Sequence, residues 1–299
     1  MIDEVFRLTT SNEKPNDPSS WQRPNWQLPK GVSRGTWDYV NDYDIASDYN
    51  RFNANHPLLE LDRTLIRKHL SDANLLQPGA SRLAIDFGCG TGRNLIPLAE
   101  AGWNVIGFDL SQQMLIEFRN NSQTAQRETT DQLAKDDMSN RCGQIHANMV
   151  EADCITDQSA DAVLCMYSSF GMIQGRENRI RFLAHVHRIL KRDGLFFVHV
   201  HNRGSWLRDP GGIQRTVKDW FKSRFDKNWE LGDRIYPYRG LPSMFLHIYS
   251  EKELVADIQS TGLKLLKLYR LDRESKAVAE FKWLAHLRTG GFLAVCTRS

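Results

Sequence analysis

Residues 85–93 read Ile85-Asp86-Phe87-Gly88-Cys89-Gly90-Thr91-Gly92-Arg93. The apolar residues Leu83-Ala84-Ile85 come before the glycines and predict a strand, and residues 94–101 follow with a helical pattern. Glycines at such a junction let bare backbone approach a ligand, and the helix N-terminus presents free N–H groups to it. The stretch therefore predicts a ligand-binding turn between a strand and a helix.

The same alternation of strands and helices continues outward from this turn. Further strands are predicted at 103–108, 162–166, 195–200, 263–269 and 292–296. Helices are predicted from residue 112, at 176–191, and from a capping box at Ser250 and Glu253 to Gly262. The polar residues 119–143 predict the end of a helix followed by a loop. Strands and helices in this order form β-α-β units, with a mostly parallel sheet covered by helices on both faces.

Four regions follow from composition and pattern. Residues 1–35 are rich in Asn, Pro, Ser and Gln and predict a flexible segment, although Trp21 and Trp26 can dock on a surface. Residues 36–80 predict a helical lid that ends at the turn residues 77–79. Residues 81–202 and 244–299 form the predicted core. Residues 203–243 break the alternation of strands and helices. Their aromatic residues are interleaved with Arg and Lys, and they predict an inserted acceptor-binding lid.

Composition limits the class of protein. The 299 residues are 41% hydrophobic and 25% charged, with a formal net charge of +3, which is too balanced to indicate a nucleic-acid or membrane protein by itself. The five cysteines form no C-x-x-C pair, so neither a disulfide framework nor a metal site is expected. The acidic N-terminus lacks a signal-peptide pattern, and no apolar stretch approaches the roughly 20 residues of a membrane span. We expect a soluble, cytoplasmic protein, whose oligomeric state the sequence does not indicate.

Charges around the glycine turn limit the kinds of ligand that it can bind. Arg93 stands where the dinucleotide fingerprint G-x-G-x-x-G would have its last glycine. Asp86 precedes the turn, where a carboxylate would repel a pyrophosphate but can orient an ammonium group. Asp109 ends the next strand and is placed to accept hydrogen bonds from a ribose diol. S-adenosylmethionine (SAM) has a ribose and a positive charge but no phosphate, and it satisfies all three conditions.

Four further segments extend the pattern, namely 107–115, 144–149, 159–166 and 189–195. With the glycine turn, they resemble the strands and turns of the class I SAM-dependent methyltransferases, including small-molecule methyltransferases. The resemblance covers residues 37–202 and 244–299. It implies a Rossmann-like three-layer α/β/α sandwich whose seven-stranded sheet is mostly parallel with the last strand antiparallel. Two positions depart from the family: Asn148 stands at an adenine-contact position that is often Asp, and Asp193-Gly194 replaces Pro-Gly.

The turn and the resemblance together predict a set of cofactor-binding residues. These are Asp86, Gly88, Cys89, Gly90, Gly92, Asp109, Leu110, Asn148, Met149 and Met166. Each also has a structural explanation. The glycines can serve helix packing, and the two methionines can belong to the core. Asp86 can bond backbone amides of the turn, and Asp109 can cap the following helix.

Candidate catalytic residues lie at or near strand ends, where open α/β sheets bind ligands. His199 and His201 share one face of the fifth predicted strand, Tyr167 follows the fourth, and His247 precedes the capped helix. A general base is needed only if the acceptor arrives protonated, so each of the four can instead be structural. The lid resembles the helix before the core in small-molecule methyltransferases, and by that resemblance three of its residues can touch cofactor or acceptor: Tyr43, Tyr49 and Arg51.

The expected activity is methyl transfer from SAM to an O, N or C nucleophile of a small molecule. A tRNA wobble-nucleoside methyltransferase is an alternative, because residues 245–250 resemble the approach to the late helix in such enzymes. A SAM-binding protein without transferase activity is another. The positive charge is concentrated in 203–243, which can close over an apolar acceptor, bind RNA, or lie on a membrane through Trp220, Phe221 and Phe225 on one helical face. Amino-methylating enzymes of adenine or cytosine are disfavoured, because residues 165–168 lack their Asn/Asp-Pro-Pro-aromatic element.

Overall fold

The computed structural model describes residues 27–54, 56–77, 80–128, 140–208, 211–274, 276–279 and 285–298. The predicted segment 1–35 is therefore described only from residue 27. Trp21, Trp26, Pro78, Gly79 and residues 129–139 of the predicted loop lie outside the described residues.

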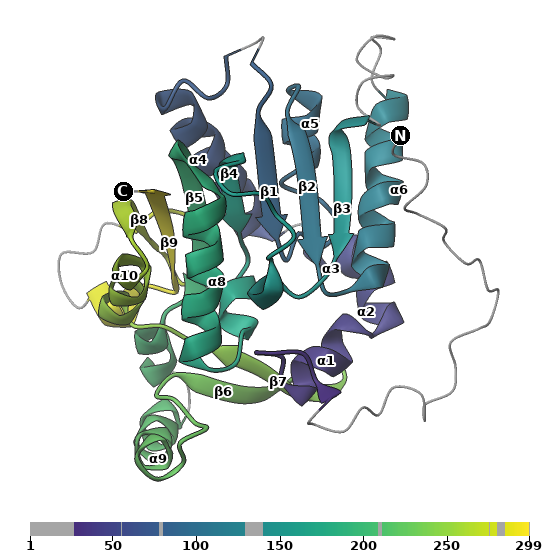
Figure 1. Ribbon diagram of the computed structural model, residues 1–299. Helices are drawn as coiled ribbons and strands as arrows, with labels where there is room; N and C mark the ends of the chain where they lie inside the picture. Colours follow the sequence, from purple (N-terminus) through teal and green to yellow (C-terminus); the bar gives the residue numbers. More distant parts are fainter. Residues whose placement is uncertain are drawn as a thin grey trace.

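A seven-stranded sheet forms the centre of the fold (Figure 1). Its strands lie in the order β3-β2-β1-β4-β5-β9-β8. Their bounds are β1 Leu83–Phe87, β2 Asn104–Asp109, β3 Cys142–His146, β4 Ala160–Cys165, β5 Leu190–His201, β8 Leu263–Leu271 and β9 Gly291–Arg298. Strand β9 is antiparallel to both of its neighbours, and the pairs among β1 to β5 are parallel. The predicted sheet, with its antiparallel last strand, is confirmed.

Helices cover both faces of the sheet, as the strand pattern predicts (Figure 1). Helices α4 Pro57–Asp72, α5 Ile96–Glu100 and α6 Gln112–Glu128 share one apolar cluster, and α8 Arg176–Ile189 and α10 Glu251–Ser260 belong to another. In β1 the side chains alternate between the clusters, because Ala84 belongs to the first and Ile85 and Phe87 to the second. The three-layer α/β/α architecture is confirmed.

Helix α6 ends at Glu128, within the polar residues 119–143 where the sequence predicted the end of a helix, and the side chains of Ser122 and Thr124 donate to carbonyls one turn back. One element boundary differs from the sequence prediction. Helix α8 ends at Ile189, and β5 begins at once, so Asp193-Gly194 lies in a bulge of the strand and not in a separate turn.

Several short elements cross the edge of the sheet where β1 and β2 end (Figure 1). The predicted lid consists of α1 Arg34–Val40, α2 Tyr43–Ser47, α3 Tyr49–Asn53 and α4. It is broken into pieces because the Asp42 side chain caps α2 and Pro57 begins α4. A hairpin of β6 Asp233–Tyr238 and β7 Leu241–His247, which the sequence did not predict, packs on α1.

The remaining elements are short, apart from one helix. They are η3 Met149–Glu151, η4 Ser169–Met172, η5 Arg203–Arg208, α9 Gly212–Phe225 and α11 Ala285–Arg288. Helix α9 stands away from the body of the molecule, below β6 in Figure 1. Across the described part of the chain, every helix is too short or too polar to traverse a lipid bilayer.

Candidate functional site

The glycine turn joins β1 to the region before α5. Gly88, Gly90 and Gly92 all have positive φ, between 53° and 82°, which L side chains adopt only with strain. At Gly92 a side chain is also excluded by packing, because a Cβ would lie 1.9 Å from Cδ2 of Phe118 in α6. Gly92 thus lets α6 pack against the turn, while Gly88 and Gly90 face the cavity described next.

A cavity opens beside the turn, and its empty space together with the solvent at its mouth amounts to about 770 Å³. Seven residues of the predicted cofactor-binding and catalytic sets line it: Gly88, Gly90, Asp109, Leu110, Asn148, Met149 and Tyr167. The structure thus brings together the ends of β1, β2, β3 and β4, which lie far apart in the chain.

Asp86 lies two residues before Gly88, and its side chain is 2% exposed. Its Oδ2 accepts a long hydrogen bond of 3.5 Å from Asn94, and its Oδ1 has no partner. Burial raises the pKa of this carboxyl to about 7, although Arg93 acts in the opposite direction. A buried carboxylate oxygen without a donor is costly, so the geometry fits a cationic ligand group at this point.

Asp109 ends β2 and lines the cavity. Its Oδ1 accepts from the backbone N–H of Ser111, and its Oδ2 accepts from that of Gly90, both at 2.8 Å. These bonds hold the carboxylate in place and leave further lone pairs on both oxygens. The residue is therefore positioned to accept hydrogen bonds from ligand hydroxyl groups.

Asn148 follows β3 at the opposite wall. Its Nδ2 donates to the backbone oxygen of Lys30 at 2.9 Å, and its Oδ1 accepts from the N–H of Val150 at 3.2 Å. The side chain therefore anchors the segment before α1, where Gly31 and Val32 also line the cavity. The sequence assigned these two residues to a loop segment, and no local pattern marks them as part of a site.

The lid closes the cavity with aromatic side chains. Tyr39 in α1 and Tyr49 in α3 line the wall, together with Tyr167. Tyr49 was predicted to touch the site, whereas Tyr39 was not. Tyr43 and Arg51 lie outside the lining: Tyr43 is exposed, and Arg51 forms an exposed ion pair with Asp48 at 2.6 Å.

Polar contacts attach the lid to the glycine turn. Thr91 Oγ1 donates to Asn50 Oδ1 at 2.7 Å, and Asn121 Nδ2 donates to the backbone oxygen of Thr91 at 3.0 Å. Asn50 Nδ2 completes the triangle with Asn121 Oδ1 at 3.2 Å. Helices α3 and α6 are thereby fixed to the same turn.

Tyr167 and Ser168 follow β4 in a strained conformation. Their φ angles are +55° and +66°, in the left-handed region that non-glycine residues seldom occupy. Tyr167 donates its hydroxyl hydrogen to Asn53 Oδ1 at 3.0 Å, and the Arg93 guanidinium lies 5.2 Å from its ring centre. Burial raises the pKa of Tyr167 to about 12, so its phenol is neutral at physiological pH. Strain of this kind is concentrated at ligand sites.

His199 and His201 lie at the end of β5, behind this strained segment. Their ring centres are 5.6 Å apart, and Nδ1 of His199 is 3.5 Å from Ser168 Oγ. Burial lowers the pKa of His201 to about 4 and that of His199 well below its usual value, so both rings are neutral at pH 7. Neither residue lines the cavity.

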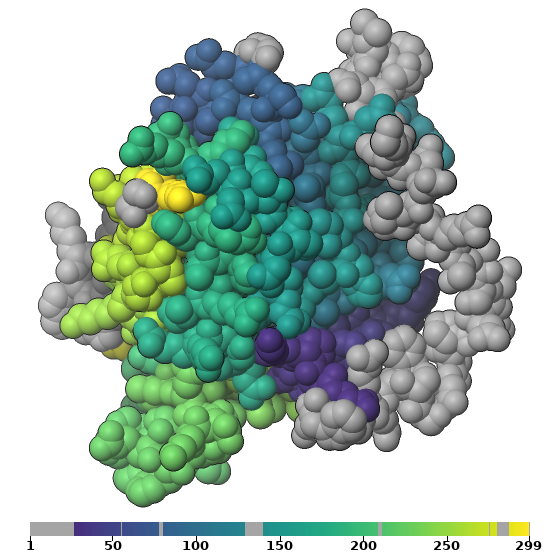
Figure 2. Space-filling model, viewed as in Figure 1, coloured from purple at the N-terminus to yellow at the C-terminus, as the bar shows by residue number. Residues whose placement is uncertain are grey.

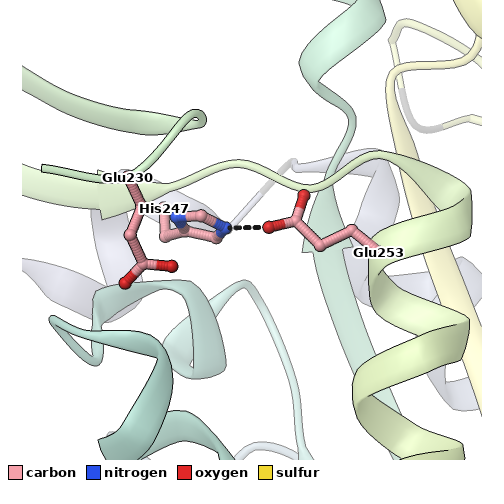
Figure 3. A group of neighbouring side chains, drawn as sticks. All are labelled: Glu230, His247 and Glu253. Carbon is pink, nitrogen blue, oxygen red and sulfur yellow. Dashed lines mark hydrogen bonds and ion pairs between the residues drawn. The ribbon is translucent and has the colours of Figure 1, made fainter. Parts of the chain in front are cut away.

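His247 lies in a separate polar cluster (Figure 3). Its Nδ1 is 2.7 Å from Asp233 Oδ1, and its Nε2 is 3.0 Å from Glu253 Oε1. Burial alone would lower its pKa, but the two hydrogen-bonded carboxylates outweigh burial and raise it. The His247 side chain therefore joins the β6–β7 hairpin to α10, away from the cavity lining.

Glu230 adjoins the same cluster and brings its carboxylate near the His247 ring (Figure 3). Three such ligand types at this spacing can hold a metal ion. Here Arg179 already pairs with Glu230 at 2.6 Å, and Arg203 with Glu253 at 3.2 Å. The cluster is thus an internally neutralised ion network.

The other predicted cofactor residues lie in the core. Cys89 and Met166 are buried in the apolar cluster on the α4 face, and Cys89 Sγ would be 2.8 Å from a Cβ at Gly107. They support the cavity wall from behind, together with Gly92. Asp86 likewise lies outside the lining itself, two residues from Gly88.

Comparison with known proteins places this site in a family. Residues 85–198 match the model of the methyltransferase domain family. The chain is 30% identical over 128 residues to a glycine/sarcosine N-methyltransferase from Aphanothece halophytica, which is 43% of each chain. It is 27% identical over 169 residues to a cypemycin N-terminal methyltransferase from a Streptomyces species, which covers 52% of this chain and 62% of that relative.

The matched regions thus span 43% and 62% of these two curated relatives. Among solved structures, the CcbJ methyltransferase from Streptomyces caelestis shares the fold, with a TM-score of 0.58, 16% identity, and coverage of 87% of this chain and 99% of that one. Residues 85–198 of this chain are thus a class I SAM-dependent methyltransferase domain.

Proposed function

We propose that this chain is a SAM-dependent methyltransferase that acts on an amine nitrogen of a small molecule or a peptide. The observation that carries the proposal is Asp86, a buried carboxylate with an unpartnered oxygen next to a glycine turn that lines a cavity. The methyltransferase domain match over residues 85–198 supports the same conclusion.

The residues at the turn fit the parts of SAM. Asp86 would pair with the ammonium group, and Asp109 would accept hydrogen bonds from the ribose hydroxyls. Leu110, Asn148 and Met149 would flank the adenine. When bound, SAM supplies a methyl group on a positively charged sulfur, which a nucleophile can take in one displacement. The chain's own task is to align the acceptor and exclude water.

The cavity wall favours an amine acceptor. Tyr39, Tyr49 and Tyr167 present neutral rings and hydroxyls, because burial raises the pKa of each phenol. Aromatic faces and hydroxyl oxygens suit an amine and the methylammonium product that it becomes. Among the described lining residues Asp109 is the one charged side chain, so a phosphate-bearing acceptor such as RNA would meet no cation there.

The two curated relatives agree with this acceptor class. Both are named for methylation of a nitrogen, in glycine or sarcosine and at the N-terminus of cypemycin. An amine that enters neutral needs no general base for the displacement itself. We therefore assign to His199 and His201 a positioning role, through Ser168 on the strained segment that carries Tyr167.

A transfer experiment tests the proposal. The full chain is incubated with methyl-labelled SAM and, separately, a small-molecule extract, a peptide mixture, a lipid extract and total tRNA. We expect label in an amine of the small-molecule or peptide fraction, and almost none with the Asp86→Asn variant. Label only in tRNA would overturn the acceptor class. Normal SAM binding with no label in any fraction would favour a SAM-binding protein without transferase activity.

A further inference from the structure

Helix α9 presents its apolar side chains outward. Ile213, Val217, Trp220, Phe221 and Phe225 are all exposed, with exposed fractions of 68% at Ile213 and 85% at Phe225. Their spacing of i, i+4, i+7, i+8 and i+12 places them in one stripe along the helix. The Trp220 and Phe221 rings contact each other edge to face, with centres 5.0 Å apart.

The opposite face of α9, which meets the rest of the chain, is polar. Thr216, Asp219 and Ser223 are the half-buried side chains there. Asp219 forms an ion pair of 2.6 Å with Arg234 of β6. A surface helix of a globular protein normally turns its apolar stripe toward the core. Helix α9 does the reverse, so its stripe is built to meet something outside this fold.

Cationic side chains accompany the stripe. Lys218, Lys222 and Arg224 are exposed on α9, and Lys227 follows its end. The ammonium group of Lys222 also lies 3.4 Å from the ring centre of Trp229. The acidic residue of α9 is Asp219, which faces the rest of the chain and is paired with Arg234. The exposed face is therefore both apolar and positively charged.

These observations point to one kind of partner. A second copy that used the same face would bring like charges together, which disfavours a symmetric dimer through α9. RNA phosphates could pair with the cations and RNA bases could stack on the aromatic rings, but neither would bury the exposed aliphatic side chains of Ile213 and Val217. Apolar residues with Trp and Phe on one face and lysines or arginines beside them are the features of a helix that lies in the interface of an anionic bilayer.

We propose that α9 docks this protein on anionic phospholipid membranes. Helix α9, the β6–β7 hairpin and α1 lie at the same end of the sheet as the carboxyl ends of β1 and β2 (Figure 1). Figure 2 shows α9 standing out from the body at that end, where it can reach a flat surface before the rest of the chain does. Docking would hold this end of the sheet, with its cavity, toward the bilayer. The proposal does not depend on the reaction that the cavity performs.

Vesicle flotation tests this proposal with the full chain. Phosphatidylcholine vesicles are compared with vesicles in which about one lipid in four is phosphatidylglycerol. The double variant Phe221→Asp/Phe225→Asp removes apolar contacts, and Lys218→Gln/Arg224→Gln removes charge. Leu266→Asp, at an exposed position of β8, is the matched control. Thermal unfolding verifies that each variant is folded.

We expect the wild type and Leu266→Asp to float with the anionic vesicles. The apolar variant should lose about tenfold or more in partitioning, and the charge variant should bind less and depend less on salt. Failure of the wild type to bind anionic vesicles would overturn the proposal, as would equal binding by Phe221→Asp/Phe225→Asp. Two other results would also overturn it: a dimer that Phe225→Asp dissociates, or binding to tRNA through Lys218 and Arg224 without binding to vesicles.

Discussion

Asp86 offers the sharpest test of the cofactor site. The substitution Asp86→Asn preserves the shape of the side chain and removes its charge. The wild-type carboxylate is 2% exposed, and its Oδ1 has no hydrogen-bond donor. Without a cationic ligand it is an unfavourable group to bury, so its charge is explained by binding.

The magnitude follows from this burial. Removing one partner of a buried charged pair costs about 2 kcal/mol or more in binding, which weakens Kd about 30-fold or more. The pKa of Asp86, raised to about 7 by burial, adds a pH dependence. Below that pH the carboxyl is protonated in the free protein, so wild-type affinity for SAM should fall about tenfold in all as the pH drops from about 8 to 6.

Calorimetric titration with SAM measures both effects. Asp86→Asn should bind weakly at every pH, and it should lose the pH dependence of the wild type. Its thermal unfolding temperature at about pH 8 should be no lower than that of the wild type, because a poorly solvated charge is removed. Asp257→Asn in α10 is the control, since Asp257 is also buried, with a raised pKa and an unpartnered Oδ2. Equal SAM affinity in wild type and Asp86→Asn would refute the assignment.

Three further substitutions have distinct expected results. Gly92→Ala should destabilise the fold by about 1–3 kcal/mol in denaturant titration, because the new Cβ would lie 1.9 Å from Phe118; Gly211→Ala, with a similar positive φ of 70° but no atom within 4 Å, should cost clearly less. His201→Ala should lower turnover with little change in SAM affinity, and unchanged turnover with the true acceptor would exclude the positioning role. His247→Gln should cost about 3 kcal/mol of unfolding free energy near pH 6. Since the pKa of His247 is raised in the fold, its ion pairs stabilise fully below about pH 6.5 and the effect fades as pH rises through the folded pKa; a loss that does not diminish toward about pH 9 would contradict this.

The sheet was predictable because its strands obey local rules. Strand β1 is an apolar run ending in glycines, and β5 and β9 are apolar runs between turn residues. The β6–β7 hairpin escaped prediction because Pro237 interrupts the strand pattern and because its two-residue turn, Arg239-Gly240, lacks the common Asn-Gly or Asp-Gly signature. The hairpin also packs on α1, which is far from it in the sequence.

The site was predictable at the strand ends and not beyond them. Gly88, Gly90 and Asp109 follow directly from the order of strand, turn and acid. The contribution of Gly31 could not be inferred, because Asn148 attaches its segment to the cavity over 118 positions of sequence. For His247 the sequence showed that the residue precedes a helix. Only the fold shows that both of its ring nitrogens are hydrogen-bonded to carboxylates.

The most direct measurement is calorimetric titration of the wild-type chain with SAM and, separately, with NAD. Arg93 stands where the dinucleotide-binding fingerprint would have its last glycine, and the buried Asp86 carboxylate, which would repel a pyrophosphate, precedes the turn. We predict saturable one-to-one binding of SAM and no detectable binding of NAD. Binding of NAD without SAM would contradict the account, and so would the absence of SAM binding near pH 8, where the Asp86 carboxyl is ionised.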